Sequence, residues 1–345
     1  MARVALVHEP PDGGVAEHVR QLARGLAAHG HDAVVLGPAA LGFRRDYRHP
    51  HRDLQALAEL TRVLGRFDLV HAHAAKAGVL ARVAAVSRKR PVVYTPHCFP
   101  FEVPDARARR WFGIAVERAL APLTATIVCV CEHERAVAVA SGIGSRRLAV
   151  VHNGCPGCGG DVDPDLARLR HDGPVVGAVT VLRRQKRLDV LLAAAPRILA
   201  AVPEASIVIV GDGPEDGALR AAADPRVVFL PFHGPAGRYL RALDVYVLPS
   251  DWEAFPIGLL EAQACGVPQV ATAVGGTPEA LGPDTGVLVP PRDAGALADA
   301  IVGLLRDPQR RAAMSAASQR RHAERFTVER MVAETAAVYE AVLAS

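Results

Sequence analysis

Short apolar runs alternate with helix-like segments along most of the chain, in two successive halves. Apolar runs bounded by glycine, proline or aspartate are typical of buried parallel strands. We expect strands in the first half at 3–7, 32–36, 68–71, 92–95, 126–130 and 148–151, and in the second half at 175–180, 206–210, 227–230, 245–248 and 269–273. This pattern predicts an α/β fold of two Rossmann-like, doubly wound domains that face a cleft at the carboxyl ends of both sheets.

The boundary between the halves is marked by composition. Residues 154–173 are rich in glycine, proline and aspartate, which favour turns. We therefore predict a first domain at 1–155, a linker at 156–173 and a second domain at 174–327.

Composition narrows the functional classes. The chain has 345 residues and a formal charge of +4, which is too small to indicate a nucleic-acid partner. No apolar run approaches the ~20 residues that span a bilayer. The first apolar run ends at His8 and is followed at once by Glu9 and Pro10, so we expect a strand there rather than a secretory signal. We expect a cytoplasmic protein.

Two glutamates frame the most informative loop. The apolar run that ends at Pro249 predicts a buried strand, and Pro256 suits the first turn of a following helix. Glu253 then lies in the loop, and Glu261 lies one to two turns into the helix, which Gly266 ends.

This loop suits a ligand with a diphosphate and a sugar. The first N–H groups of a helix have no carbonyl partner within the helix and point toward an anion. We expect such an anion cradle in the turn formed by Phe255, Pro256, Ile257 and Gly258, where Pro256 itself has no N–H. Carboxylates accept hydrogen bonds from sugar hydroxyls. Surface glutamates after a strand are also common in α/β proteins that bind no such ligand.

The pattern from Pro249 to Glu279, Pro-Ser-x-x-Glu-x-Phe-Pro-x-x-x-Leu-Glu-Ala-x-Ala-x-Gly-x-Pro-x-Val-Ala-Thr-x-x-Gly-Gly-x-Pro-Glu, resembles the retaining glycosyltransferases of the GT-B fold known as family 4. Ala254 stands where that family usually has glycine, and its methyl group is tolerated only if φ is negative. The resemblance implies that the last helix, within 328–345, packs back on the first domain.

Motifs in the first half resemble the same family. Gly13 and Gly14 open a helix like the family's glycine loop, with Gly14 expected at the donor phosphates, although a simple turn into a helix explains the pair equally well. The segment 93–101 resembles a subset that builds surface polysaccharides and lipid-linked glycans. There the histidine that matches His97 lies over the transferred sugar, and Cys98 replaces a glycine.

The segment 178–192 resembles the part of the family that supplies an arginine and a lysine to the diphosphate. Lys186 matches the lysine, whereas Val181 stands at the arginine position. Arg183 or Arg184 is expected to substitute, and the sequence does not choose between them.

The resemblance implies a retaining transferase that uses a nucleotide-diphosphate sugar, expected to be UDP-linked, and a hydroxyl acceptor such as a lipid-linked glycan or polysaccharide precursor. Lys186, one arginine and the helix N–H groups hold the diphosphate, Glu253 and His97 contact the sugar, and Glu261 binds the ribose. No metal and no cofactor is expected. The alternatives are a nucleotide-sugar 2-epimerase of the same fold and a catalytically degenerate sugar-nucleotide-binding protein.

Two other nucleotide-binding classes fail on spacing. The nearest match to a dehydrogenase fingerprint, from Gly211 to Gly217, is off by one residue and contains a proline. A P-loop needs lysine followed by serine or threonine, and none of Lys76, Lys89 and Lys186 is so followed.

Cysteine and histidine pairs raise metal or redox alternatives. Cys155 and Cys158 form a CxxC without the second pair that zinc sites usually need, so we expect an inert pair of loop thiols, with Cys265 isolated. His71 and His73 could offer two metal ligands from one strand, but satisfied strand-end histidines are the commoner state.

Basic residues beside aromatics suggest a membrane contact in the first half. The segments 44–48, 99–101 and 107–112 carry them, including Trp111 and Phe112. Such patches can rest on an anionic membrane, here its inner face. The alternative is an amphipathic helix in which both aromatics pack inward and the arginines are solvated.

Overall fold

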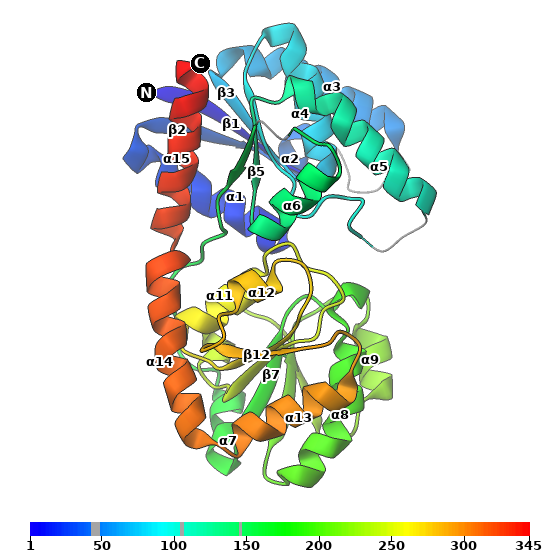
Figure 1. Ribbon diagram of the computed structural model, residues 1–345, viewed down its shortest axis with the longest axis vertical. Coiled ribbons are helices and arrows are strands. Elements are labelled where there is room, and N and C mark those ends of the chain that lie inside the picture. The colour runs from blue at the N-terminus through cyan, green and yellow to red at the C-terminus, as the bar shows by residue number, and fades with distance from the viewer. Residues whose placement is uncertain (43–48, 104–106, 145–146) are drawn as a thin grey trace. The chain divides into compact units, whose positions relative to one another are not determined.

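The computed structural model describes residues 1–42, 49–103, 107–144 and 147–345, and it divides into two compact units (Figure 1). Unit 1 contains Met1–Gly154 and Val328–Ser345, and unit 2 contains Cys155–Thr327. The basic cluster of Arg44, Arg45 and Arg48 lies outside the described residues.

Unit 1 is built on a parallel sheet with the order β2-β1-β3-β4-β5-β6. Both faces of the sheet are covered: Val4 and Leu6 of β1 pack on one side, and Ala5 and Val7 on the other. The strands are β1 Ala2–His8, β2 His31–Leu36, β3 Leu69–His73, β4 Val92–Thr95, β5 Thr126–Cys129 and β6 Leu148–Val150.

The helices of unit 1 form the two outer layers. α1 and α15 contribute to one hydrophobic cluster, and α3 and α4 contribute to the other. The helices are α1 Gly13–Leu26, α2 Pro38–Leu41, α3 Pro50–Val63, α4 Ala75–Arg88, α5 Arg107–Leu120, α6 Glu132–Ala140 and α15 Val328–Ala344, with 3-10 turns at Ala27–His29, Leu64–Arg66 and Ala121–Leu123.

The C-terminal helix α15 lies against α1 within unit 1 (Figure 1, red beside blue). Gly25 permits this close approach, because a Cβ there would lie 2.6 Å from Val332 Cγ2. The ring of Tyr339 in α15 is fully buried and meets the edge of His31.

Unit 2 repeats the architecture with the order β12-β11-β10-β7-β8-β9, again parallel. Its strands are β7 Val175–Val179, β8 Ser206–Val210, β9 Val227–Leu230, β10 Val245–Leu248, β11 Gln269–Thr272 and β12 Gly286–Val289. The prediction of two Rossmann-like domains is confirmed, although β12 was not among the predicted strands.

The helices of unit 2 surround this sheet. α8 and α13 pack side by side on one face, where their leucines and isoleucines form the largest hydrophobic cluster of the described residues (Figure 1). The helices are α7 Pro164–Asp172, α8 Leu188–Ala201, α9 Asp216–Ala222, α10 Gly237–Leu240, α11 Ile257–Ala264, α12 Thr277–Ala280, α13 Ala294–Leu305 and α14 Pro308–Arg325, with a 3-10 turn, η4, at Arg184–Lys186.

The predicted linker at 156–173 differs from the structure, because it contains helix α7 and belongs to unit 2. Asp163 caps this helix by accepting hydrogen bonds from the N–H groups of Asp165 and Leu166, and Pro164 suits its first turn. Gly173 is needed for packing, because a Cβ there would overlap the carbonyl group of Glu204.

The prediction of an inert Cys155–Cys158 thiol pair is wrong. Cys158 forms a disulfide with Cys265, which caps the end of α11, while Cys155 is a buried free thiol. The two bonded cysteines are 107 residues apart in the sequence, so their contact depends on the folding of unit 2.

The alternative in which Trp111 and Phe112 pack inward is also wrong. Their exposed fractions are 68% and 70%, because the buried side of α5 begins only at Ile114. Among the described residues, no helix combines the length and the apolar character that crossing a bilayer requires.

Candidate active site

The strand order of unit 2 places two loops together. β7 pairs with β10, and the chain continues from β7 toward β8 on one side and from β10 toward β11 on the other. Ligands of doubly wound sheets bind at such a switch point, at the carboxyl ends of the strands. The loop after β7 carries Lys186, and the loop after β10 carries Glu253.

Lys186 and Glu253 form an ion pair at this position. Lys186 Nζ lies 2.5 Å from Glu253 Oε1, and Ser250 Oγ donates to the same oxygen at 2.6 Å. Ser250 is fully buried, and its carbonyl oxygen accepts a hydrogen bond from Thr272 Oγ1. The Glu253 side chain is 8% exposed and that of Lys186 is 18% exposed, so the pair is accessible from one side and held in place from the other.

The two loops are joined by further hydrogen bonds. Gln185 Nε2 donates to the Trp252 carbonyl at 2.7 Å, and the Asp251 N–H donates to the Gln185 carbonyl at 2.9 Å. Arg187 and Arg292 both pair with Asp251. Burial opposes ionisation of Asp251, but hydrogen bonds from Arg292 and Arg187 hold its pKa below the ordinary value. Asp251 therefore stays charged and fixes the lysine loop to the glutamate loop.

Helix α11 begins directly after the glutamate loop. Pro256 is its N-cap, and Glu261 lies one turn inside it. Gly258 lets the helix approach β10, because a Cβ there would lie 2.6 Å from Tyr246 Oη. Burial, with the charges of Glu261 and Glu253 nearby, raises the pKa of Tyr246. Both glutamates therefore lie near the neutral side chain of Tyr246, which contacts the first turn of α11.

Ala254 fits its position without strain, since it is not among the non-glycine residues with positive φ in the described chain. The methyl group that departs from the family pattern is therefore tolerated. Gly275 meets the same loop, and a Cβ there would overlap the Glu253 carbonyl.

A cavity of about 310 Å³ lies beside the lysine loop, and its walls include Arg183, Arg184 and Arg187. Arg183 is partly buried and Arg184 is exposed. Val181, at the family's arginine position, is 38% exposed and carries no charge. Both candidate arginines therefore line the cavity.

Unit 1 has its own switch point, between β1 and β3. α1, which follows β1, begins at Gly13, whose φ of +79° requires glycine, and Gly14 is exposed in its first turn. His73 ends β3, and His97 follows β4.

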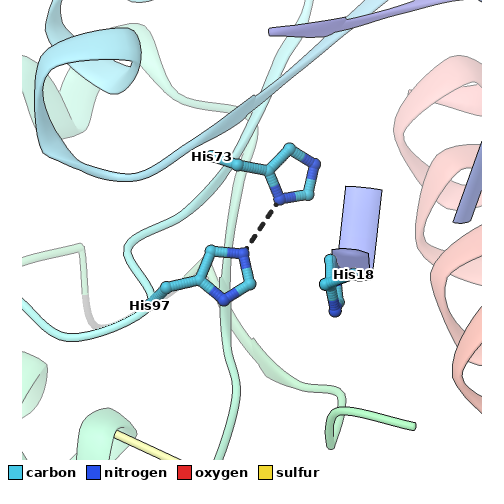
Figure 2. A group of neighbouring side chains, drawn as sticks. All are labelled: His18, His73 and His97. Carbon is cyan, nitrogen blue, oxygen red and sulfur yellow. Dashed lines mark hydrogen bonds between the residues drawn. The ribbon is translucent and has the colours of Figure 1, made fainter. Parts of the chain in front are cut away.

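His97 belongs to a cluster of imidazoles with His73 and His18 (Figure 2). His73 Nδ1 lies 3.1 Å from His97 Nε2, and the His18 ring meets the His97 ring edge-on at 4.8 Å between centroids. Burial lowers the pKa of His18 to about 4 and lowers those of His73 and His97 well below the ordinary value. All three rings are therefore neutral at neutral pH.

His71, in contrast, is satisfied by hydrogen bonds. Its Nδ1 lies 2.6 Å from Tyr339 Oη and its Nε2 lies 2.8 Å from Thr95 Oγ1. Both ring nitrogens of His71 are engaged, so the structure does not support His71 and His73 as a metal-binding pair.

The His97 loop has an unusual backbone. His97 and Cys98 have φ values of +53° and +89°, which explains why the resembling family has glycine at the Cys98 position. Glu134 holds the loop by accepting hydrogen bonds from the N–H groups of Cys98 at 2.6 Å and Val130 at 2.8 Å. Burial raises the pKa of Glu134 to about 7.

Comparison with known proteins decides the family. Residues 12–156 match the family described as Glycosyltransferase Family 4, and residues 173–307 match the family described as Glycosyl transferases group 1. The chain belongs to the GT-B glycosyltransferases of family 4.

Two relatives of this family 4 protein are named for a specific transferase activity. It is 38% identical over 163 residues to the Corynebacterium glutamicum GDP-mannose-dependent monoacylated alpha-(1-6)-phosphatidylinositol monomannoside mannosyltransferase, covering 44% of this chain and 42% of that protein. It is 28% identical over 244 residues to the Escherichia coli UDP-Gal:alpha-D-GlcNAc-diphosphoundecaprenol alpha-1,3-galactosyltransferase, covering 65% of this chain and 63% of that protein. The match thus spans less than two thirds of either relative.

A solved structure supports the fold. The crystal structure of Anabaena HepE in complex with UDP and glucose matches with a TM-score of 0.82 at 20% identity, covering 99% of this chain and 100% of that chain.

The structure adds residues that the sequence analysis of this family 4 protein did not assign to the site. Ser250 and Asp251 lie inside the predicted motif, and their nearness to Glu253 in the sequence could have indicated that they belong to the site. Glu134 and His18 had no such signal, because each reaches the His97 region only through the pairing of distant strands.

Proposed function

We propose that this protein is a retaining glycosyltransferase that moves a sugar from a nucleotide-diphosphate sugar to a hydroxyl acceptor. The observation that carries the proposal is the Lys186–Glu253 ion pair at the switch point of unit 2, directly before α11. A cation and a carboxylate side by side suit a ligand that presents phosphate oxygens next to sugar hydroxyls.

Glu253 is oriented to use one oxygen for support and the other for the sugar. Both hydrogen bonds described above, from Lys186 and Ser250, go to Oε1. Oε2 can then accept from donor-sugar hydroxyls. His97 is assigned to sugar contact on the family resemblance.

The diphosphate has three sources of positive potential in unit 2. Lys186 can donate to phosphate while it still donates to Glu253, because an ammonium group has three protons. Arg183 or Arg184 adds a planar donor from the cavity wall. The first-turn amides of α11 add the positive end of a helix dipole. We assign no metal, since these groups can neutralise the leaving diphosphate.

In the proposed reaction, the bond between the anomeric carbon and the diphosphate oxygen breaks, and the acceptor oxygen bonds to the same face of that carbon. The acceptor proton passes to an oxygen of the leaving diphosphate. The chain mainly positions the reactants and stabilises the developing charge. Glu261, one turn into α11, is assigned to the donor ribose.

The donor base and acceptor class are drawn from the relatives. We propose UDP, the nucleotide named for the galactosyltransferase and for the HepE complex, although the mannosyltransferase is named for GDP-mannose. Both curated names describe acceptors that carry a lipid, so we propose a lipid-linked glycan or polysaccharide precursor.

We also propose that α5 rests on an anionic membrane surface. Trp111 and Phe112 are exposed beside Arg107 and Arg110, which are exposed as well. Each basic residue near such a surface contributes about 1 kcal/mol, and the aromatics suit the interface.

Co-sedimentation with liposomes that contain phosphatidylglycerol checks this surface. We expect the wild type to pellet at low salt and to be released at high salt, and W111S/F112S to pellet less. A wild type that stays in the supernatant at low salt refutes the membrane proposal, and a soluble acceptor then becomes the leading choice.

Incubation with a panel of nucleotide sugars tests the function itself. Release of free nucleotide with transfer or slow hydrolysis of the sugar supports it. An isomerised sugar nucleotide indicates the 2-epimerase, and binding without turnover indicates a degenerate binding protein.

A further inference from the structure

We propose that His18, His73 and His97 form a binding site for a transition-metal dication of the zinc class. The three side chains come from α1, the end of β3 and the loop after β4, and each offers one nitrogen, all within 4.8 Å of one another (Figure 2). They converge although the chain separates them widely, because β1, β3 and β4 are neighbours in the sheet.

The spacing is close to that of a tetrahedral site. Zinc binds imidazole nitrogen at about 2.0–2.1 Å, so two ligands of one tetrahedral ion lie about 3.3 Å apart. His73 Nδ1 and His97 Nε2 are already 3.1 Å apart. The three ligand atoms lie within 4.8 Å of one another, so the His18 ring must move toward the other two for all three to bind one ion.

The cluster has unused hydrogen-bonding capacity. Within the described chain, His18 Nδ1 and His73 Nε2 are buried and have no hydrogen-bond partner. The His73–His97 contact needs only one proton between two nitrogens. A metal ion in place of the shared proton would bind the lone pairs of His73 Nδ1 and His97 Nε2. The buried His18 Nδ1, which costs free energy without a partner, is available as the third ligand.

The protonation state also favours a metal. Metal binding requires imidazole nitrogens that carry no proton, and here burial keeps all three rings neutral at neutral pH. His71 stays outside the set, since both its nitrogens are held by Tyr339 and Thr95.

The ligand set selects the metal class. Imidazole suits Zn²⁺, Cu²⁺, Ni²⁺ and Co²⁺, whereas Mg²⁺ and Ca²⁺ prefer oxygen. Three neutral histidines leave a fourth position for water or an anion. His97 is assigned to sugar contact, and a metal ion bound to His97 would make its side chain unavailable to the sugar. We therefore expect Zn²⁺ to inhibit sugar transfer. Only this consequence rests on the proposed function.

Titration of metal-free protein with Co²⁺ tests the binding site without any need for activity. We expect one equivalent to give the intense visible bands of four-coordinate Co²⁺, and Zn²⁺ to displace it with a Kd in the micromolar range or below. H18Q and H73Q should each weaken binding at least a hundredfold. The surface pair His49 and His51, whose rings lie 5.8 Å apart, supplies the control H49Q/H51Q, which should bind as the wild type does.

Three results overturn the site: no binding by the wild type, binding that survives in both H18Q and H73Q, or binding lost in H49Q/H51Q. If the glutamine variants do not fold, zinc anomalous scattering from wild-type crystals locates the ion, and an ion elsewhere refutes the assignment. Co²⁺ bands in a protein without transferase activity would leave this site standing while the proposed function fails.

Discussion

Lys186 and Glu253 lie 67 residues apart in the sequence and 2.5 Å apart between Nζ and Oε1. Two residues to which the sequence analysis gave separate roles, diphosphate and sugar, are therefore one unit before the donor arrives. The pair is held by Ser250 on the glutamate and by the Gln185–Trp252 and Asp251 contacts between the loops. This connection implies that changing either residue also disturbs the partner's position.

Glu253→Gln is expected to lower kcat/KM on the order of a hundredfold or more, because the amide removes the charge that orients Lys186 and halves the acceptor capacity toward the sugar. Steady-state transfer kinetics measure this. Asp216→Asn, which breaks an exposed pair with Arg220, is the matched control and should keep wild-type kinetics. Near-normal turnover in folded Glu253→Gln would remove Glu253 from the site.

Glu261→Gln is expected to weaken nucleotide binding more than it slows chemistry. Its carboxylate lies one turn into α11 and is assigned to the ribose, which does not change during transfer. Calorimetric titration with UDP, compared with kcat, separates the two effects. Unchanged UDP affinity together with a large loss of kcat would contradict the ribose assignment.

Cys98→Gly is expected to raise the free energy of unfolding by about 0.5–1 kcal/mol. A side chain at φ +89° costs about 1–2 kcal/mol, and the greater freedom of glycine in the unfolded chain offsets part of that gain. Urea denaturation measures the change. Cys98→Ser keeps the strain and should not stabilise, so equal stabilisation by both variants would point to the thiol rather than to the backbone.

Stability is expected to fall as pH drops from 6.5 to 5.5. His18 has its pKa lowered to about 4, and those of His71, His73 and His97 are also lowered, so in this window the unfolded chain binds more protons than the folded one. Glu134, with its pKa raised to about 7, acts in the opposite direction, since its folded form loses stability as pH rises from 4.5 through 7. Each histidine lowers the free energy of unfolding by about 1 kcal/mol over this window and Glu134 raises it by about 1 kcal/mol, so we expect a net loss of about 3 kcal/mol.

Chemical denaturation across this pH range measures the slope. The slope of the free energy of unfolding against pH reports how many more protons the unfolded chain binds than the folded one. His18→Gln should lower that number by up to one, whereas His171→Gln, at an exposed histidine, should leave it unchanged. A flat profile in the wild type would show that the cluster is protonated or accessible to water in the folded state.

The strands could be predicted closely because buried parallel strands are continuous apolar runs between turn residues. β4, β8, β9 and β10 have the bounds expected from sequence. Helix α7 was missed because glycine and proline suggested a linker, whereas Pro164 and Asp163 in fact begin a helix and Gly173 serves packing. Local composition does not distinguish glycine and proline in a flexible linker from glycine and proline at the ends of a helix.

The site was predictable where its residues share a motif and not where they meet through the fold. Glu253 and Glu261 stand in one motif with Ser250, so their association was visible in the sequence. The His18–His73–His97 cluster and the Cys158–Cys265 disulfide join segments whose contact depends on strand order and helix packing. The exposure of Trp111 likewise depends on where the neighbouring core ends, which the helix sequence does not encode.

Single-donor transfer in excess EDTA, with product stereochemistry followed by NMR, tests the proposed retaining, metal-independent transfer. UDP-sugars and GDP-sugars are offered separately to wild type and Glu253→Gln. We predict that one UDP-sugar is consumed without added metal, that the anomeric configuration of the donor is kept in the product, and that Glu253→Gln loses this activity. Inversion at the anomeric carbon, or activity that EDTA abolishes and Mn²⁺ restores, would contradict this prediction.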